Sequence, residues 1–443
     1  MIDRYTAGRI RMARNLIAGI LDEKREYASL KDLCPKGQEL RPLPPPKPVE
    51  GHAAVDGGNY VGVHNDYTFY VVKAWAYIHE AGYGQGDAWM GILIPPHHPD
   101  YRVTIYREVL EAASLVGDGI PGGRDLAREA GIVYFDGSIR NAIRWWSPGA
   151  VSFGDEEKPD IGRDLPLARD ILWNYYNSGY GLDSLSHLQC NGRDDCVREF
   201  IARAPARPMV PGLVMELAAK RLAEGDLRRS KWITTLEVVE KLYLYMRAIE
   251  SAWAGGGMPL FLSKTSTSTR LCGEKHSDLY YLRILHRGNP DPGYIAWEGG
   301  VLCGAYEITR LKRGGRLEGA RPICPVEAGD GEPRFYPREL GLYDFYVKRL
   351  GAVEFYVRLA RGRPFMLANL LFDMRDPPET MDDVYRLVEE ALARAVSTPL
   401  VDGYPLSLIM AHYHARILPE EALAVARGVG LELEPMARSK LRY

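Results

Sequence analysis

The sequence predicts an α/β protein in which helices lie on the faces of a mixed β-sheet. Short runs rich in apolar, β-branched and aromatic residues indicate strands. In the first third of the chain these runs lie at 52–56, 68–78, 90–94 and 131–136. Segments with helical periodicity lie between and after the strands, most clearly at 213–223 and 234–253. Strands that come first and helices that follow are typical of a sheet covered by helices.

The remainder of the chain continues this alternation. Further strands are expected at 259–264, 304–311, 342–359 and 365–372. Further helices are expected at 5–27, 101–116, 380–395 and 405–417, and from residue 419 onward.

Three parts are expected along the 443 residues. Residues 1–48 combine a helix with a Pro-rich, extended linker. Residues 49–418 form the main domain, which carries a helical insertion at about 150–255. Residues 419–443 form a C-terminal helix and tail.

Composition and charge restrict the class of protein only broadly. Lys+Arg is 56 and Asp+Glu is 58, and this balance neither indicates nor excludes a nucleic-acid partner. No stretch is apolar enough to span a bilayer and the N-terminus lacks a signal-peptide core, so we expect a cytoplasmic protein without membrane contact. The six cysteines form no zinc-type CxxC doublet. We expect buried or free thiols, although Cys190 and Cys196 are close enough to pair.

Two aspartates share one local pattern. Asp56 and Asp136 each follow an apolar strand and precede glycine, in VDGG and FDGS. Glycine leaves the carboxylate open to close approach by a ligand. Two such carboxylates on adjacent strands can bind one Mg²⁺ or Mn²⁺, because hard cations prefer oxygen ligands. Asp-Gly is also a common turn dipeptide, so either pair alone more often indicates a hairpin turn, and a turn is expected at Gly57-Gly58.

A third carboxylate is expected from the helix at 101–116. Glu108 and Glu111 lie one turn apart on it and can point the same way. Glu129 is a further alternative, because a Gly-rich loop stretches the separation of Glu111 from Asp136. An isolated helical glutamate more often belongs to a solvent-exposed charged face.

Three further side chains are candidates for binding phosphate or moving a proton. Lys264 ends the strand PLFLSK before a Ser/Thr-rich loop, where an ammonium can bind phosphate. Tyr404 and His412 lie just over two helical turns apart, and His412 can protonate a leaving group. His414 competes for that role on another face of the helix. A lone histidine on an apolar helix is more often a core residue.

The order of these motifs resembles the NurA family of nucleases, which occurs in archaea and bacteria. The motifs are VDGG, RxxLE on a helix, an apolar strand into FDGS, a strand into SK, and GYPxxLxxAHxxARI. The resemblance covers residues 50–418 or so and implies a metal-binding set of Asp56, Glu111 and Asp136. It implies that Lys264, Tyr404 and His412 complete the catalytic set, and Asp278 resembles a later acidic position of the family.

The resemblance also implies a fold, an activity and partners. The fold would be a ribonuclease-H-like mixed β-sheet flanked by helices, with helical insertions. The activity would be a 5′-to-3′ exonuclease on single- and double-stranded DNA, with endonuclease action on single strands. Mn²⁺ is the expected metal, with Mg²⁺ as the alternative and one or two ions bound. The protein would be a homodimer that works with a HerA-type hexameric ATPase in DNA end resection.

Two other interpretations stay open at the level of sequence. A different ribonuclease-H-like phosphodiesterase would keep the carboxylates and act on RNA or branched DNA. An inactive DNA-end scaffold or loading factor would bind its partner without Asp56. The pair Trp145-Trp146 can stack on bases, but core packing or a dimer contact explains it equally well.

Overall fold

The computed structural model describes residues 34–63, 68–93, 99–143, 161–203, 207–220, 231–273, 276–305 and 339–428. The helix expected at 5–27, the Trp145-Trp146 pair and most of the strand expected at 304–311 lie outside these residues. None of the helices in the described ranges has the length and apolar character needed to cross a membrane.

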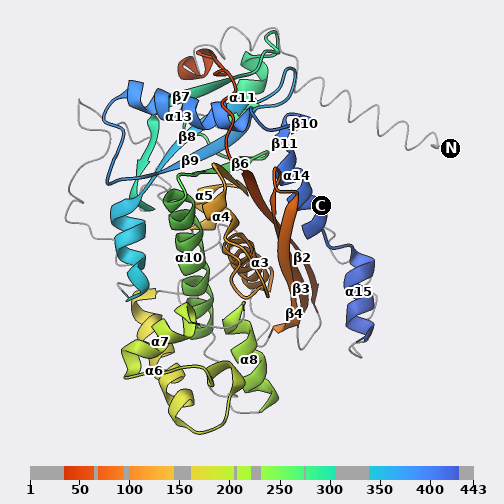
Figure 1. Cartoon of the computed structure of the whole chain (residues 1–443), viewed down its shortest axis with the longest axis vertical. Helices are drawn as coiled ribbons and strands as arrows, with labels where there is room; N and C mark the ends of the chain where they lie inside the picture. The colour runs from red at the N-terminus through yellow and green to blue at the C-terminus, as the bar shows by residue number, and fades with distance from the viewer. Residues whose placement is uncertain are drawn as a thin grey trace, which may run out of the picture.

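Nine of the described strands form one mixed sheet (Figure 1). The strands are β1 (Arg41–Pro42), β2 (His52–Val63), β3 (Thr68–Ile78), β4 (Tyr83–Leu93), β5 (Ile132–Asp136), β6 (Met258–Ser263), β7 (Gly293–Cys303), β8 (Leu350–Arg358) and β9 (Met366–Asp373). Their order is β1-β7-β8-β9-β6-β5-β2-β3-β4. β5 runs parallel to β2 and to β6, and the other neighbouring pairs are antiparallel. The parallel centre places the ends of β5 and β6 side by side, next to the middle of β2.

Helices cover both faces of the sheet. The helices are α3 (Pro99–Val116), α4 (Leu126–Glu129), α5 (Ile139–Ala142), α6 (Ile161–Asn177), α7 (Arg193–Ala202), α8 (Met209–Ala219), α10 (Lys231–Ala254), α11 (Asp278–Leu285), α13 (Met381–Ala395), α14 (Leu406–Ala415) and α15 (Pro419–Gly428). On one face α3 packs against β2 and β3, and α10 packs against α3. On the other face α14 packs against β2 and β3, beside the ribbon of β10 (Leu400–Val401) and β11 (Tyr404–Pro405). The layers therefore run from α10 through α3 and the sheet to α14.

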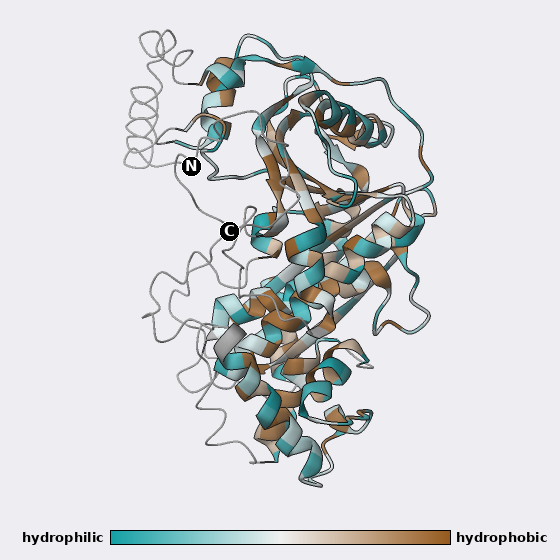
Figure 2. Cartoon of the chain, turned by 90° about the vertical axis from the view of Figure 1, so that its left-hand side faces the viewer, coloured by the Kyte–Doolittle hydropathy of each residue, from teal (hydrophilic) through white to brown (hydrophobic). Residues whose placement is uncertain are grey.

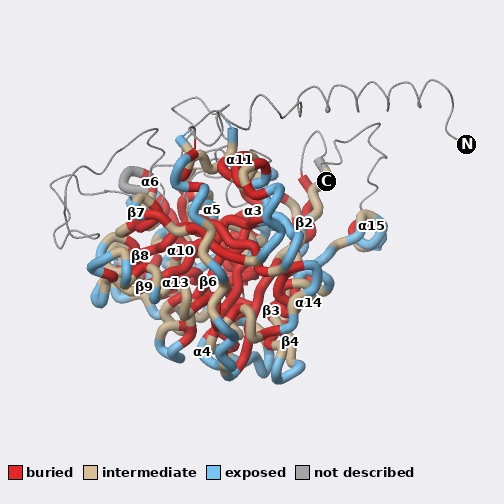
Figure 3. Tube along the Cα trace, turned by 90° about the horizontal axis from the view of Figure 1, so that it is seen from above, coloured by how far each residue is buried: buried red, intermediate tan, exposed pale blue. Residues whose placement is uncertain are grey.

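The pattern of apolar residues explains these layers. Every residue of β8 is buried, as expected for a strand covered on both faces. The strands are largely apolar, whereas the surrounding helices alternate apolar and polar sides (Figure 2). Seen from above, burial concentrates in the sheet and in α3 and α10, while α15 lies at the exposed margin (Figure 3). Two large apolar clusters result, one on each face.

Most predicted elements are confirmed, with shifted ends. The strand predicted at 68–78 matches β3 residue for residue, and the helix predicted at 101–116 is α3. β7 ends at Cys303, so the strand predicted at 304–311 does not include Gly304 and Ala305, and the rest of that prediction lies outside the described residues. Only the second half of the segment 342–359 is a strand, since a π-helical turn at Asp344–Arg349 precedes β8. The insertion predicted at about 150–255 contains α6, α7, α8 and α10, and the domain division itself stays a prediction.

The turn predicted at Gly57-Gly58 is wrong. β2 continues through both glycines to Val63, with Gly57 opposite Ala74 and Gly58 opposite Lys73 on β3. The glycines serve close packing. A Cβ atom at Gly57 would lie 2.5 Å from the Glu111 carboxylate, and one at Gly58 would overlap the Ala415 carbonyl oxygen. Glycine is thus needed where helices approach the strand from both sides.

The expectation of free thiols is also wrong. Cys34 is joined to Cys272 and Cys190 to Cys196, and none of the cysteines in the described residues is free. The first bridge joins residues 238 apart in sequence, and only the folded chain brings them together. It ties the start of the described chain to the segment before α11.

Candidate metal and active site

Asp56 and Asp136 lie next to each other where β5 ends. The parallel register pairs Val55 with Phe135, so the two aspartates follow at equivalent positions on adjacent strands. Neighbouring strands in register point equivalent side chains to the same face. Asp56 is buried with 7% of its surface exposed, whereas Asp136 is exposed. The sequence-based prediction that these carboxylates come from adjacent strands is confirmed, although Asp56 lies within its strand and not at its end.

The Asp56 carboxylate has two fixed contacts. Its Oδ1 accepts a hydrogen bond of 2.7 Å from the Gly57 backbone N–H. Its Oδ2 lies 2.6 Å from Nδ1 of His412, on α14. Burial and the nearby charge of Asp136 raise the pKa of Asp56, and the contacts with His412 and Gly57 oppose the rise. A positive charge beside the two aspartates would therefore stabilise their ionised forms.

Tyr404 and Lys264 form a second arm of the site. The Tyr404 hydroxyl donates a hydrogen bond of 2.7 Å to Oδ1 of Asp136. Lys264 Nζ lies 3.6 Å from the centre of the Tyr404 ring, an arrangement typical of a cation–π contact. Burial, together with the charge of Asp136, raises the pKa of Tyr404, so the hydroxyl keeps its proton. The arm thus places a fixed donor and a cation beside Asp136.

Glu111 approaches from the opposite face of the sheet. Its carboxylate lies against Gly57, the residue after Asp56, where a side chain would collide with it. Oε1 lies 3.1 Å from Nε of Arg107, and the Tyr245 hydroxyl donates a 3.1 Å hydrogen bond to Oε2. The pKa of Glu111 is raised to about 8, chiefly by burial; Arg107 opposes the rise, and the charges of Glu108 and Asp56 add to it. The electrostatic contact with Asp56 links Glu111 to the aspartate pair.

The other candidate acids have partners elsewhere. Glu108 pairs with Lys241 of α10 at 3.2 Å. Glu129 pairs with Arg124 at the surface. Asp278 is fully buried and accepts hydrogen bonds from the Tyr356 hydroxyl at 2.7 Å and from the Cys272 N–H at 2.9 Å. It belongs to the packing around α11. Among the three glutamates that the sequence left open, Glu111 is the one beside Asp56.

Two residues near the carboxylates were not predicted from the sequence. Arg107 stands in the RxxLE motif and, being one turn before Glu111, had a signal that could have indicated an ion pair. Tyr245 has no such signal, because it lies 134 residues from Glu111 and on a helix of mixed composition. His414, the competitor of His412, stacks on Trp75 at 5.1 Å between ring centres.

The donor set can be tested for its fit to a divalent cation. Within the described ranges, no three His, Cys, Asp or Glu side chains are close enough together to form a complete metal site. Asp56 and Asp136 nevertheless supply carboxylate oxygens from neighbouring strands, and burial together with their mutual repulsion raises the pKa of Asp56. Hard cations such as Mg²⁺ and Mn²⁺ suit a few carboxylates completed by water and phosphate. The pair fits such an ion, with Glu111 adjacent.

The chain matches the family model described as the NurA domain over residues 51–417. This chain belongs to the NurA family. The match includes every residue discussed above, from Asp56 to His412. Among curated protein sequences, none matches the chain.

Solved structures share the fold at low sequence identity. The NurA nuclease from Sulfolobus solfataricus is 16% identical, with a TM-score of 0.54 over 97% of both chains. A second NurA crystal structure is also 16% identical, with a TM-score of 0.56 over 95% of this chain and 96% of that one. A NurA structure bound to dAMP and manganese is 15% identical, with a TM-score of 0.50 over 97% of both chains. These likenesses establish a NurA-type mixed sheet flanked by helices.

Proposed function

We propose that this NurA-family chain is a metal-dependent deoxyribonuclease that uses Mn²⁺, with Mg²⁺ as the alternative. The observation that carries the proposal is the Asp56–Asp136 pair, two carboxylates from adjacent strands that contact His412 and Tyr404. Membership of the NurA family supports it. A solved NurA structure bound to dAMP and manganese is consistent with a nucleotide and a divalent ion at such a site in a relative.

Each residue has a distinct part in phosphodiester hydrolysis. Asp56 and Asp136 would hold the cation, and Glu111 would complete the set from the other face. Bound metal supplies a water of lowered pKa and offsets charge on the phosphate. Lys264, which lies on the Tyr404 ring, would offset phosphate charge, and Tyr404 would fix Asp136 through its hydrogen bond. His412 orients Asp56 through Nδ1, which leaves Nε2 for the phosphate or the leaving oxygen.

The finer features of the proposal follow the family resemblance. We infer a ribonuclease-H-like core, 5′-to-3′ exonuclease activity on single- and double-stranded DNA, and endonuclease activity on single strands. We also infer a homodimer that acts in the cytoplasm with a HerA-type hexameric ATPase in DNA end resection. The intact set of Asp56, Asp136 and Glu111 favours an enzyme over an inactive scaffold, which would have no need of them.

The test is cleavage of end-labelled single- and double-stranded DNA with Mn²⁺, Mg²⁺ or EDTA. Wild-type protein should degrade DNA only with a metal, and Asp56→Ala should not. Glu129→Ala is the matched control, because Glu129 is a carboxylate paired with Arg124 away from the site. A folded wild-type protein that cleaves nothing under any metal would sink the proposal. Faster cleavage of RNA would move it to another phosphodiesterase class.

A further inference from the structure

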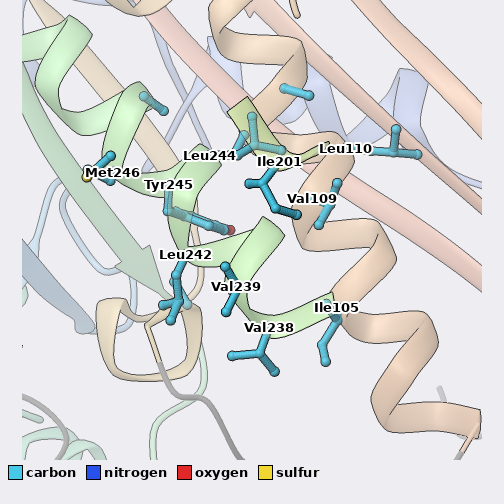
Figure 4. Close-up of a cluster of buried hydrophobic side chains, with 14 of the residues drawn as sticks. Ile105, Val109, Leu110, Ile201, Val238, Val239, Leu242, Leu244, Tyr245 and Met246 are labelled. Atoms are coloured by element: carbon cyan, nitrogen blue, oxygen red, sulfur yellow. The ribbon is translucent and has the colours of Figure 1, made fainter. Parts of the chain in front are cut away.

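Three polar contacts cross the otherwise apolar interface between α3 and α10. Figure 4 shows the apolar setting, with Ile105 and Val109 of one helix facing Val238 and Val239 of the other. Within it, α10 presents Glu237, Lys241 and Tyr245 at intervals of four residues, which places them along one helix face. Each makes a polar contact with α3.

The first contact, between Glu237 and Arg102, is the one farthest from Glu111 along the two helices. Glu237 accepts hydrogen bonds from Arg102, with Nη2 to Oε1 at 2.6 Å, and from the Tyr106 hydroxyl. The Glu237 side chain is fully buried. Because both charges are removed from water together, this pair fixes the helices against each other without involving the carboxylates of the site.

The second contact, between Lys241 and Glu108, determines which glutamate of the RxxLE motif pairs with Arg107. Lys241, whose side chain is 2% exposed, lies 3.2 Å from Oε2 of Glu108. Arg107 lies farther from Glu108, at 3.8 Å, than from Glu111, at 3.1 Å. Lys241 thus offsets the charge of Glu108, and Arg107 is left to pair mainly with Glu111.

The third contact reaches the candidate site. The Tyr245 hydroxyl donates to Oε2 of Glu111, while Arg107 contacts Oε1, so each carboxylate oxygen has its own partner. The Tyr245 ring also lies 6.0 Å from the ring of Phe135, the residue before Asp136. Tyr245 therefore contacts both Glu111 and β5, the strand that carries Asp136.

We propose that Tyr245, on α10 of the helical insertion, is a positioning residue that holds the Glu111 carboxylate in the orientation required for divalent-cation binding. The inference rests on the proposed function, since it assigns Glu111 a part in that binding. A buried carboxylate with two oxygens can rotate about its last bond, and the Tyr245 hydrogen bond to one oxygen, together with the Arg107 ion pair at the other, restrains that rotation. Outer-shell partners of metal ligands typically affect metal affinity by about 10- to 100-fold.

The experiment compares Tyr245→Phe with Tyr106→Phe in the full-length chain. Each variant removes one buried hydroxyl that donates to a glutamate across the same two helices, but only Tyr245 contacts Glu111. Mn²⁺ binding to the metal-free proteins is measured from the electron paramagnetic resonance signal of free Mn²⁺. Thermal unfolding in EDTA reports any loss of stability. DNA affinity is measured in EDTA.

We expect Tyr245→Phe to weaken Mn²⁺ binding by about 10-fold while DNA affinity in EDTA is unchanged. Tyr106→Phe should lower the unfolding temperature as much and leave Mn²⁺ affinity unaltered. In a Glu111→Gln background, Tyr245→Phe should cause no further loss of Mn²⁺ affinity, because the two changes act through one carboxylate.

Three results would overturn the inference alone. These are equal Mn²⁺ affinity for wild type and Tyr245→Phe, an equal loss in both tyrosine variants, or a loss in Tyr245→Phe that persists in the Glu111→Gln background. A folded wild-type protein that binds no Mn²⁺ is a different result. It would overturn the proposed function, and the positioning role of Tyr245 with it.

Discussion

The two faces of the sheet around Asp56 differ in how they hold charge. On the α14 face, Asp56 lies beside the exposed Asp136 and contacts His412, whose side chain is 69% exposed. On the α3 face, Glu111 is buried between Arg107 and Tyr245. The first face exposes Asp136 and His412 to solvent, and the second is closed and has a cation paired to its carboxylate.

The two faces therefore have different roles: ligands exchange on the α14 face, and Glu111 is positioned on the α3 face. A divalent ion and a phosphate must enter and leave through water, which the open face allows. A carboxylate buried without an adequate cation is unfavourable in its charged form, and the raised pKa values of Glu111 and Asp56 express that cost. The closed face therefore gives up stability in the metal-free protein in order to keep Glu111 in place.

The largest expected effect is on the open face, from Asp136→Asn. This change keeps the Tyr404 hydrogen bond available but removes one of the two charges facing a cation. Metal-based stabilisation of the transition state amounts to several kcal/mol, so nuclease activity should fall by about 1,000-fold or more. The rate of cleavage of labelled DNA at saturating Mn²⁺ measures it.

Asp87→Asn is the control for Asp136→Asn, because Asp87 is an exposed aspartate on the edge strand β4. Its activity should equal that of wild type. If Asp136→Asn retained more than a tenth of wild-type activity, the open face would not hold the catalytic ion.

The next effect is a pH dependence of stability that originates on the closed face. The pKa of Glu111 is about 8 in the folded chain against 4.5 as the ordinary value. Between these values the folded protein holds a proton that the unfolded chain has released. The free energy of unfolding in EDTA should therefore fall as pH rises from about 4.5 to about 8, by about 3 to 5 kcal/mol in total.

Urea unfolding at several pH values measures this dependence. Glu111→Gln removes the titrating group, so its free energy of unfolding should change less across the same window. Asp56, whose pKa is also raised, leaves a smaller slope of the same sign in that variant. Parallel curves for the two proteins would show that Glu111 ionises normally in the fold.

Gly57→Ala tests the point where the two faces meet. The added methyl group would lie 2.5 Å from Oε1 of Glu111 and 2.6 Å from Cγ of Arg107. Overpacking of this kind typically costs about 1 to 3 kcal/mol of stability. Activity should fall as well, because the methyl group displaces Glu111 from Asp56. Gly288→Ala is the control, since a Cβ atom there meets no neighbouring atom. Unchanged activity in Gly57→Ala would separate Glu111 from catalysis.

Local patterns made most of the sheet predictable. β3 is rich in β-branched and aromatic residues along its whole length, and its predicted bounds are those observed. β2 was predicted too short, because Gly57-Gly58 has the sequence of a turn and here permits close packing from both faces. Sequence alone does not distinguish these two uses of glycine, since the difference depends on what lies above and below the strand.

The candidate site likewise contains residues that local patterns predict and contacts that they do not. Asp56 and Asp136 were predictable as neighbours because each has its own strand and glycine. The contacts of Glu111 with Tyr245 and of Glu108 with Lys241 depend on the packing of α10 against α3, which no local motif encodes. The disulfide between Cys34 and Cys272 was missed for the same reason.

The smallest expected effect comes from His412→Gln, on the open face. The side chain is largely exposed and its one contact in the described structure is Nδ1 to Asp56 Oδ2, so unfolding should change by less than about 0.5 kcal/mol. Activity should fall about tenfold if His412 mainly orients Asp56. His414→Gln, two residues along α14, loses a ring stacked on Trp75 and should show the opposite result: lower stability and nearly full activity. A loss above about 100-fold in His412→Gln would instead indicate proton transfer to the leaving oxygen. In that case the pH profile of the wild-type cleavage rate should show an ionisation that is absent from the profile of His412→Gln.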